Sequence, residues 1–169
     1  MKLRVAGVKK ESLIDGPGVS FVIFTQGCYR ECPECHNPDA RSLEGGTDFT
    51  LEELKEEIGS SKYIDTLVFS GGEPFLQAEE LARLGEWAQK RGLKIVTYSG
   101  YTFEYLLDKS NEHSGYRQLL EISDILIDGA YVDAERDLML AFRGSKNQRI
   151  IDVKPSLQSG EAVIMEKFG

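Results

Sequence analysis

Short apolar runs alternate along this chain with segments in which apolar residues recur at helical spacing. The first strong run, residues 19–25, is rich in Val, Ile and Phe and ends in Gln26-Gly27, which is typical of a buried strand. Four later runs have the same character: 66–70, 93–98, 125–127 and 149–153. Between the runs, the spacing of apolar residues predicts helices in four segments: 51–58, 78–91, 103–107 and 116–120.

Local signals mark the ends of two of these helices. Thr50 precedes the first helix, and Glu53 follows three residues later, which is the pattern of a capping box. Gly92 directly follows the second helix and is expected to end it. The predicted strands and helices therefore have definite boundaries.

Continuous apolar strands separated by helices indicate a parallel sheet that is covered on its faces. About five strands are too few for a complete eight-stranded barrel, so we expect an α/β fold with an open partial (β/α) barrel and a mostly parallel sheet. Loops at the carboxyl ends of parallel strands meet at one rim. We expect one domain over residues 1–169, with residues 155–169 as a C-terminal extension.

Composition and charge narrow the possible partners. The chain has 169 residues and a formal net charge of -8, which argues against broad binding of nucleic acid. No apolar run approaches the roughly 18 residues that suggest a membrane span, and no apolar segment follows the charged N-terminus as in a signal peptide. We therefore expect no nucleic-acid partner and no membrane partner.

The three cysteines, Cys28, Cys32 and Cys35, form one cluster in the sequence. An odd number in so short a window does not form a disulfide framework, which favours a reducing, cytoplasmic location and a metal or redox site. A structural zinc normally takes four protein ligands, and His36 is poorly placed as the fourth because it directly follows Cys35. A [4Fe-4S] cluster on three thiolates keeps one iron open for another ligand. The residues alone leave open both the cluster and a zinc knuckle completed by an acidic residue.

A second unusual sequence, Gly71-Gly72-Glu73-Pro74, directly follows the strand predicted at 66–70. Glycines at this point allow positive φ angles and a close approach of the backbone to a ligand. A tight turn between strand and helix would also explain the pair. If the sheet is parallel, this turn faces the cysteines across the rim.

Together these residues resemble the radical S-adenosylmethionine superfamily, whose signature is Cys-x3-Cys-x2-Cys followed by Gly-Gly-Glu-Pro. The Asp-Gly-Pro-Gly sequence at 15–18 resembles the glycyl-radical-enzyme activases. Three stretches are similar to activating enzymes of the anaerobic ribonucleotide reductase: 35–38, 126–129 and 143–149. The resemblance extends from about residue 14 to about residue 152. The chain departs from many relatives at Ala130, where they carry Lys.

The resemblance implies a [4Fe-4S] cluster on Cys28, Cys32 and Cys35, with S-adenosylmethionine at the open iron. It implies cofactor contacts from eight residues: Glu34, Cys35, His36, Gly71, Gly72, Glu73, Tyr98 and Ser99. No catalytic side chain is expected beyond the cluster and the cofactor. The implied activity is reductive cleavage of S-adenosylmethionine to generate a glycyl radical on anaerobic ribonucleoside-triphosphate reductase. A small electron-donor protein is the second implied partner.

Three alternatives stay open at this point. The first is an activase of another glycyl-radical enzyme of the pyruvate formate-lyase type, and the second is a radical S-adenosylmethionine enzyme that acts on a small molecule. The third is a zinc-stabilised binding module without enzymatic activity. Segment 143–149, which is basic and contains glycine, is either a partner contact or a solvated turn.

Overall fold

A seven-stranded mixed sheet with the order β3-β1-β2-β4-β5-β6-β7 forms the centre of the computed structural model, which describes residues 1–30, 35 and 38–168. The strands are β1 (Lys2–Ser12), β2 (Ser20–Thr25), β3 (Thr47–Thr50), β4 (Thr66–Gly71), β5 (Lys94–Tyr98), β6 (Ile125–Asp128) and β7 (Arg149–Asp152). The four central strands β2, β4, β5 and β6 are parallel, and β1, β3 and β7 run antiparallel to their neighbours. The predicted α/β class with an open, mostly parallel sheet is confirmed.

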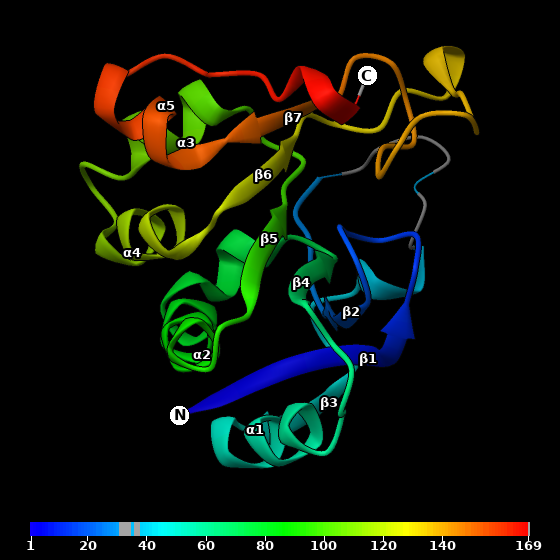
Figure 1. The fold of residues 1–169 in the computed structure, drawn as a ribbon, viewed down its shortest axis with the longest axis vertical. Coiled ribbons are helices and arrows are strands. Elements are labelled where there is room, and N and C mark those ends of the chain that lie inside the picture. Colours follow the sequence, from blue (N-terminus) through cyan, green and yellow to red (C-terminus); the bar gives the residue numbers. More distant parts are fainter. Residues whose placement is uncertain (31–34, 36–37, 169) are drawn as a thin grey trace.

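The helices pack against one face of this sheet; in Figure 1 they run from α1 at the bottom, through α2 and α4 on the left, to α3 and α5 at the upper left. They are α1 (Leu51–Gly59), α2 (Ala78–Lys90), α3 (Phe103–Lys109), α4 (Ser114–Ile122) and α5 (Val153–Ser159). Short 3-10 turns are η1 (Pro38–Ala40), η2 (Pro74–Gln77), η3 (Asp133–Glu135) and η4 (Glu166–Phe168). In the described part of the chain, no helix has the length and apolar content that crossing a bilayer requires.

Alternate residues along the central strands point to the two faces, and both faces are buried. Phe21 and Phe69 belong to the large core beneath the helices. Val22 and Val68 belong to a smaller core on the other face, against which Phe142 packs from the long connection between β6 and β7. Burial on both sides explains why these strands read as continuous apolar runs.

The predicted ends of α1 and α2 are confirmed. The N–H of Glu53 donates to Thr50 Oγ1 at 3.1 Å, and the N–H of Thr50 donates to Glu53 Oε2 at 2.7 Å, which completes the capping box. Gly92 follows the end of α2 with a φ of +85°. Only glycine adopts such an angle without strain, so it ends the helix.

Three elements were not expected from the sequence: β1, β3 and α5. Of the eleven residues of β1, only Leu3, Val5 and Ser12 are buried, and β3 has only four residues, so neither strand carries a clear alternation. The strand expected at 149–153 exists as β7, but it is antiparallel to β6 because its connection returns along the rim without a crossover helix.

The C-terminal residues continue along the edge of the sheet at β7. The N–H of Asp152 donates to the carbonyl of Val163 at 2.9 Å, and the N–H of Met165 donates to that of Ile150 at 2.8 Å. Phe168 then meets Phe142 edge-on, with ring centres 5.2 Å apart. This segment covers an edge strand that would otherwise expose unpaired backbone groups.

Candidate iron–sulfur and cofactor site

A cavity of about 720 Å³ lies at the carboxyl ends of β2, β4, β5 and β6, and this volume is typical of small-molecule sites. Its walls include seven residues that the sequence singled out: Cys28, Cys35, Gly71, Gly72, Glu73, Tyr98 and Ser99. The loops after the parallel strands therefore meet at one place, as the sequence predicted. Cys32, Glu34 and His36 lie outside the described residues.

The cysteine-bearing segment leaves β2 through a hydrogen-bonded base. The N–H of Gly27 donates to the carbonyl of Ala40 at 2.7 Å, and the N–H of Cys28 donates to that of Arg41 at 3.1 Å. The side-chain amide of Gln26 donates to two further carbonyls of the returning segment. Backbone contacts thus position Cys28 at the end of β2.

The glycine pair is required by packing against this base. Gly71 has a φ of +102°, and a Cβ atom there would overlap the backbone of Thr25. A Cβ atom on Gly72 would overlap the carbonyl oxygen of Gly27 and would lie 2.7 Å from that of Ala40. The N–H of Gly72 donates to the Thr25 carbonyl at 2.8 Å, so this donor already serves the protein. The two glycines therefore bring the end of β4 against the root of the cysteine segment.

Glu73 is a fully buried carboxylate that joins two loops of the cavity wall. Its Oε1 accepts from the hydroxyl of Ser99 at 2.9 Å and from the N–H of Phe75 at 3.2 Å, and its Oε2 accepts from the N–H of Gly100 at 2.8 Å. Burial raises the pKa of Glu73 to about 7, although these hydrogen bonds and the charge of Arg30 act in the opposite direction. Burial therefore favours the neutral form of this acid.

Tyr98 connects the end of β5 to two other loops. Its hydroxyl lies 3.0 Å from the carbonyl of Asp15 and 2.8 Å from that of Phe142, and its single proton is shared between these acceptors. Burial, followed by the nearby Asp15 carboxylate, raises the pKa of Tyr98. Beside it, Ser99 Oγ accepts the N–H of Tyr101 at 3.0 Å. In the described structure, both predicted hydroxyl groups are engaged with the protein.

Arg30 is a cavity residue that the sequence reasoning did not single out. Its guanidinium carbon lies 5.1 Å from the centre of the Tyr101 ring, and its side chain lies against Gly100. Its Nε is buried and has no hydrogen-bond partner among the described residues. Its position between two signature cysteines gave no signal, because the motif fixes only the cysteines.

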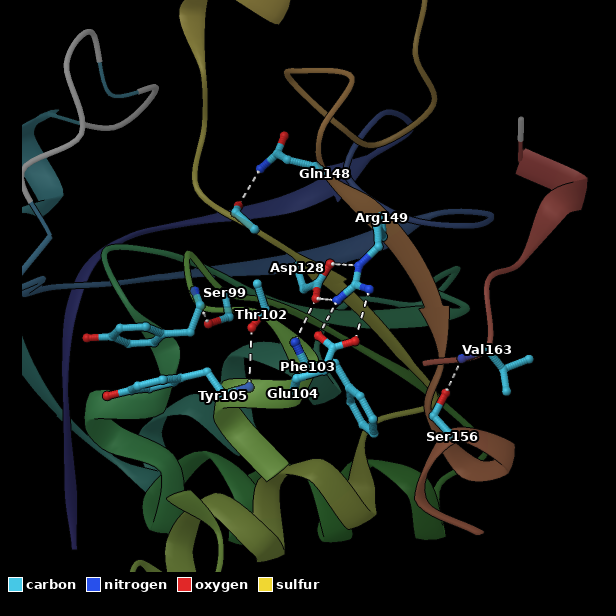
Figure 2. Close-up of polar contacts among 12 residues, drawn as sticks. Ser99, Thr102, Phe103, Glu104, Tyr105, Asp128, Gln148, Arg149, Ser156 and Val163 are labelled. Carbon is cyan, nitrogen blue, oxygen red and sulfur yellow. Dashed lines mark hydrogen bonds and ion pairs between the residues drawn. The ribbon is translucent and has the colours of Figure 1, made fainter. Parts of the chain in front are cut away.

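The end of β6 is held by an ion pair that Figure 2 shows in close-up. Asp128 is fully buried, and its carboxylate accepts the N–H of Phe103 at 2.7 Å and two hydrogen bonds from Arg149 at 3.0 and 2.5 Å. Arg149 also donates to both carboxylate oxygens of Glu104. The hydrogen bonds to Asp128, and after them those to Glu104, raise the pKa of Arg149. The hydrogen bonds from Arg149 lower the pKa of Glu104. They join β6, β7 and α3 behind the cavity.

Segment 143–149 is built by its own side chains. Gln148 Oε1 accepts the N–H groups of Gly144 and Ser145, and its Nε2 donates to the carbonyl of Gly129 at 3.0 Å (Figure 2). Arg143 donates to backbone carbonyls at both ends of the segment and in the C-terminal turn. Two of the three basic residues of the segment therefore support the fold.

The two cysteines within the described residues, Cys28 and Cys35, are suitable ligands for an iron–sulfur cluster. The thiols of Cys28 and Cys35 line the same cavity as the glycine turn, and thiolates are the usual ligands of such clusters. The described residues hold no group of three metal-ligating side chains, since the middle cysteine lies outside them. Nothing in the described walls supplies a histidine to complete a zinc site.

The comparison with known families agrees with this site. Residues 14–151 match the family described as "4Fe-4S single cluster domain". This match covers most of the chain, and the chain belongs to this family.

The most informative relatives are activating enzymes. The chain is 32% identical over 145 residues to the anaerobic ribonucleoside-triphosphate reductase-activating protein of Enterobacteria phage T4, covering 81% of this chain and 86% of that protein. It is 31% identical over 150 residues to the pyruvate formate-lyase-activating enzyme of Clostridium pasteurianum, covering 85% of this chain and 59% of that protein. It matches the Listeria monocytogenes enzyme of the same name with 30% identity, covering 95% of this chain and 66% of that protein. The chain thus spans less than two thirds of these two longer relatives. The resemblance to cluster-containing activating enzymes is confirmed.

Among solved structures, QueE from Escherichia coli aligns with a TM-score of 0.49 and 20% identity, covering 60% of this chain and 54% of that one. This structural similarity is weak.

Proposed function

We propose that this chain is an activating enzyme that uses a [4Fe-4S] cluster and S-adenosylmethionine to generate a glycyl radical on an anaerobic ribonucleoside-triphosphate reductase. The main support is that Cys28, Cys35 and the turn at Gly71-Gly72 line one cavity at the ends of four parallel strands. A cysteine loop facing that turn is the arrangement that the resemblance requires. Thiols that must stay reduced to bind iron suit a cytoplasmic location.

Cys28, Cys32 and Cys35 would hold the cluster, and the iron without a protein ligand would take the amino and carboxylate groups of the cofactor. The cluster would supply the single electron for reductive cleavage of S-adenosylmethionine, and this chemistry would end with a hydrogen atom taken from a glycine Cα of the partner. That electron would come from a small electron-donor protein. Glu34 and His36 would approach the adenine from the cysteine segment.

The described residues would act by fixing the walls around these groups. Gly72 keeps the cysteine segment against β4, and Glu73 keeps the β4 turn against the β5 loop. Tyr98 and Ser99 support the same walls through their hydroxyl groups. Arg30, whose buried Nε is unpartnered within the described part of the chain, places a positive charge close enough to Glu73 to lower the pKa of that carboxyl group.

The reductase is the first candidate partner because the phage relative, at 32% identity, is named as a reductase-activating protein. The chain covers 86% of the phage reductase-activating protein but 59% of the Clostridium lyase-activating enzyme. A pyruvate formate-lyase is the second candidate partner, because several of the relatives carry that name.

Metal analysis after anaerobic purification tests the proposal first. We expect iron and sulfide in equal amounts and little zinc, with absorbance near 400 nm that bleaches on reduction. Cys28→Ala, Cys32→Ala and Cys35→Ala are each expected to abolish formation of 5′-deoxyadenosine, because a cluster on two thiolates is labile. One zinc per chain without sulfide would instead favour a zinc-stabilised binding module. Full cleavage activity in any of the three variants would contradict the ligand assignment.

A further inference from the structure

Two loops beside the cavity each expose a pair of large aliphatic side chains. Leu13 and Ile14 are 76% and 69% exposed, and Leu138 and Met139 are 80% and 92% exposed. Leu13, Ile14 and Leu138 line the cavity wall, and Met139 follows directly in the chain. Apolar side chains that gather at the mouth of a cavity, rather than occurring singly, are typical of a binding surface. These four residues are called the apolar rim.

The loop that carries Leu138 and Met139 is firmly held on both sides of these residues. The carboxylate of Asp137 accepts a hydrogen bond from the N–H of Met139 at 2.9 Å, and the N–H of Asp137 donates to the carbonyl of Gly144 at 3.2 Å. On the far side, Phe142 packs against the smaller core, and its carbonyl accepts from Tyr98. The polar and aromatic residues hold the loop, and the aliphatic residues are the ones left at its surface.

The loop that carries Leu13 and Ile14 has the same construction. Ser12 Oγ accepts the N–H of Ile14 at 3.3 Å and donates to the carboxylate of Asp15. The carbonyl of Asp15 lies within hydrogen-bond distance of the Tyr98 hydroxyl, which also contacts the carbonyl of Phe142 in the other loop. One half-buried phenol at the end of β5 therefore contacts the loops that carry both halves of the apolar rim.

Three basic residues near this mouth are already engaged with other groups of the protein. Lys9 lies 3.7 Å from Asp15, and the basic residues Arg143 and Arg149 serve the fold through carbonyl and carboxylate contacts. A partner that met this mouth would therefore find an apolar surface, even though the whole chain carries a net charge of -8. Apolar anchors enclosed by a polar surround are typical of the energetic centre of a protein interface.

From this geometry we infer that the apolar rim is the docking surface for the protein substrate, and that it receives an extended segment with apolar side chains next to the reacting glycine. This inference rests on the proposed function, which requires a polypeptide to reach the cavity. It assigns recognition to residues 13–14 and 138–139 rather than to the basic segment 143–149.

Kinetics with the reductase as variable substrate test the inference. The double variant Leu138→Ser with Met139→Ser is expected to raise the half-saturating reductase concentration by about tenfold, with a similar effect for Leu13→Ser with Ile14→Ser. Iron content and far-ultraviolet circular dichroism are expected to stay within about twofold of wild type, because the side chains are largely exposed. The matched control is Tyr63→Ser, a 79% exposed aromatic residue that precedes the amino end of β4.

Binding of the reductase and of a pyruvate formate-lyase, measured without turnover, distinguishes a failure of the docking surface from a failure of the proposed function. Wild type that binds a partner and makes no radical would contradict the proposed function, while weaker binding by the rim variants would still support the docking surface. Half-saturation and binding within about twofold of wild type in both double variants would overturn the docking surface. An equal loss in Tyr63→Ser, or no binding of either protein by wild type, would overturn it as well.

Discussion

Glu73→Gln is expected to remove a pH-dependent cost from the folded protein. The carboxyl group has a pKa of about 7 in the fold and 4.5 in an exposed chain, because burial disfavours its charged form. An acid with a raised pKa contributes stability below pH 4.5, and this contribution is lost as the pH rises to about 7. Glutamine stays neutral throughout, so only wild type loses this contribution.

The size of the effect follows from the two pKa values. Their difference corresponds to about 3 kcal/mol in total, most of which falls between pH 5 and pH 8. The variant also has a constant cost of about 1–3 kcal/mol, because an amide cannot accept from Phe75, Ser99 and Gly100 as two carboxylate oxygens do. The pH dependence, rather than the absolute difference, therefore isolates the ionisation.

Urea unfolding of iron-free wild type and Glu73→Gln at several pH values measures this difference, provided that the m-values agree. We expect the variant to gain on the order of 2–3 kcal/mol relative to wild type from pH 5 to pH 8. Glu86→Gln on the exposed side of α2 is the control, for which no such trend is expected. A difference that stays constant across this range, or one that moves in favour of wild type, would refute the account of Glu73.

Two further substitutions test how the cavity walls are held. Gly72→Ala is expected to lower the iron content and the unfolding free energy, the latter by about 2 kcal/mol, because its Cβ would overlap a carbonyl at the root of the cysteine segment. Gly59→Ala, with nothing within 4 Å of the new Cβ, is its control. Arg149→Met is expected to cost about 3 kcal/mol, because a buried carboxylate loses its cation. Arg117→Met at an exposed pair is expected to cost at most about 0.5 kcal/mol.

Iron analysis and urea unfolding read out both substitutions. Gly72→Ala with wild-type iron and stability would show that the glycine is not needed for packing. Equal costs for Arg149→Met and Arg117→Met would show that the pair with Asp128 contributes no more than a surface contact.

The central strands were predictable from the sequence because they are buried on both faces. The runs that include Phe21 and Phe69 contain consecutive apolar residues at 21–24 and 67–69, as is typical of strands buried on both faces. β1 was not predictable, because six of its eleven residues are exposed and four of these are charged. Its pairing with β2 and β3 depends on the whole sheet, which local patterns do not encode.

The place of the site was predictable, but the detailed role of its residues was not. The loops that carry Cys28 and Gly72 meet because parallel strands bring their carboxyl ends together. That Tyr98 uses its hydroxyl to hold two loops depends on residues far apart in sequence, Asp15 and Phe142. Such long-range contacts leave no signal in the local order of residues.

The central claim is that this cavity holds a cluster and a cofactor that together make a radical on a protein glycine. Electron paramagnetic resonance of the anaerobic protein, mixed with reductant, S-adenosylmethionine and an anaerobic ribonucleoside-triphosphate reductase, tests it most directly. The account predicts a glycyl-radical doublet on the reductase that is absent with Cys35→Ala. A wild-type sample with a full complement of iron and sulfide that gives no doublet with this reductase or with a pyruvate formate-lyase would contradict it.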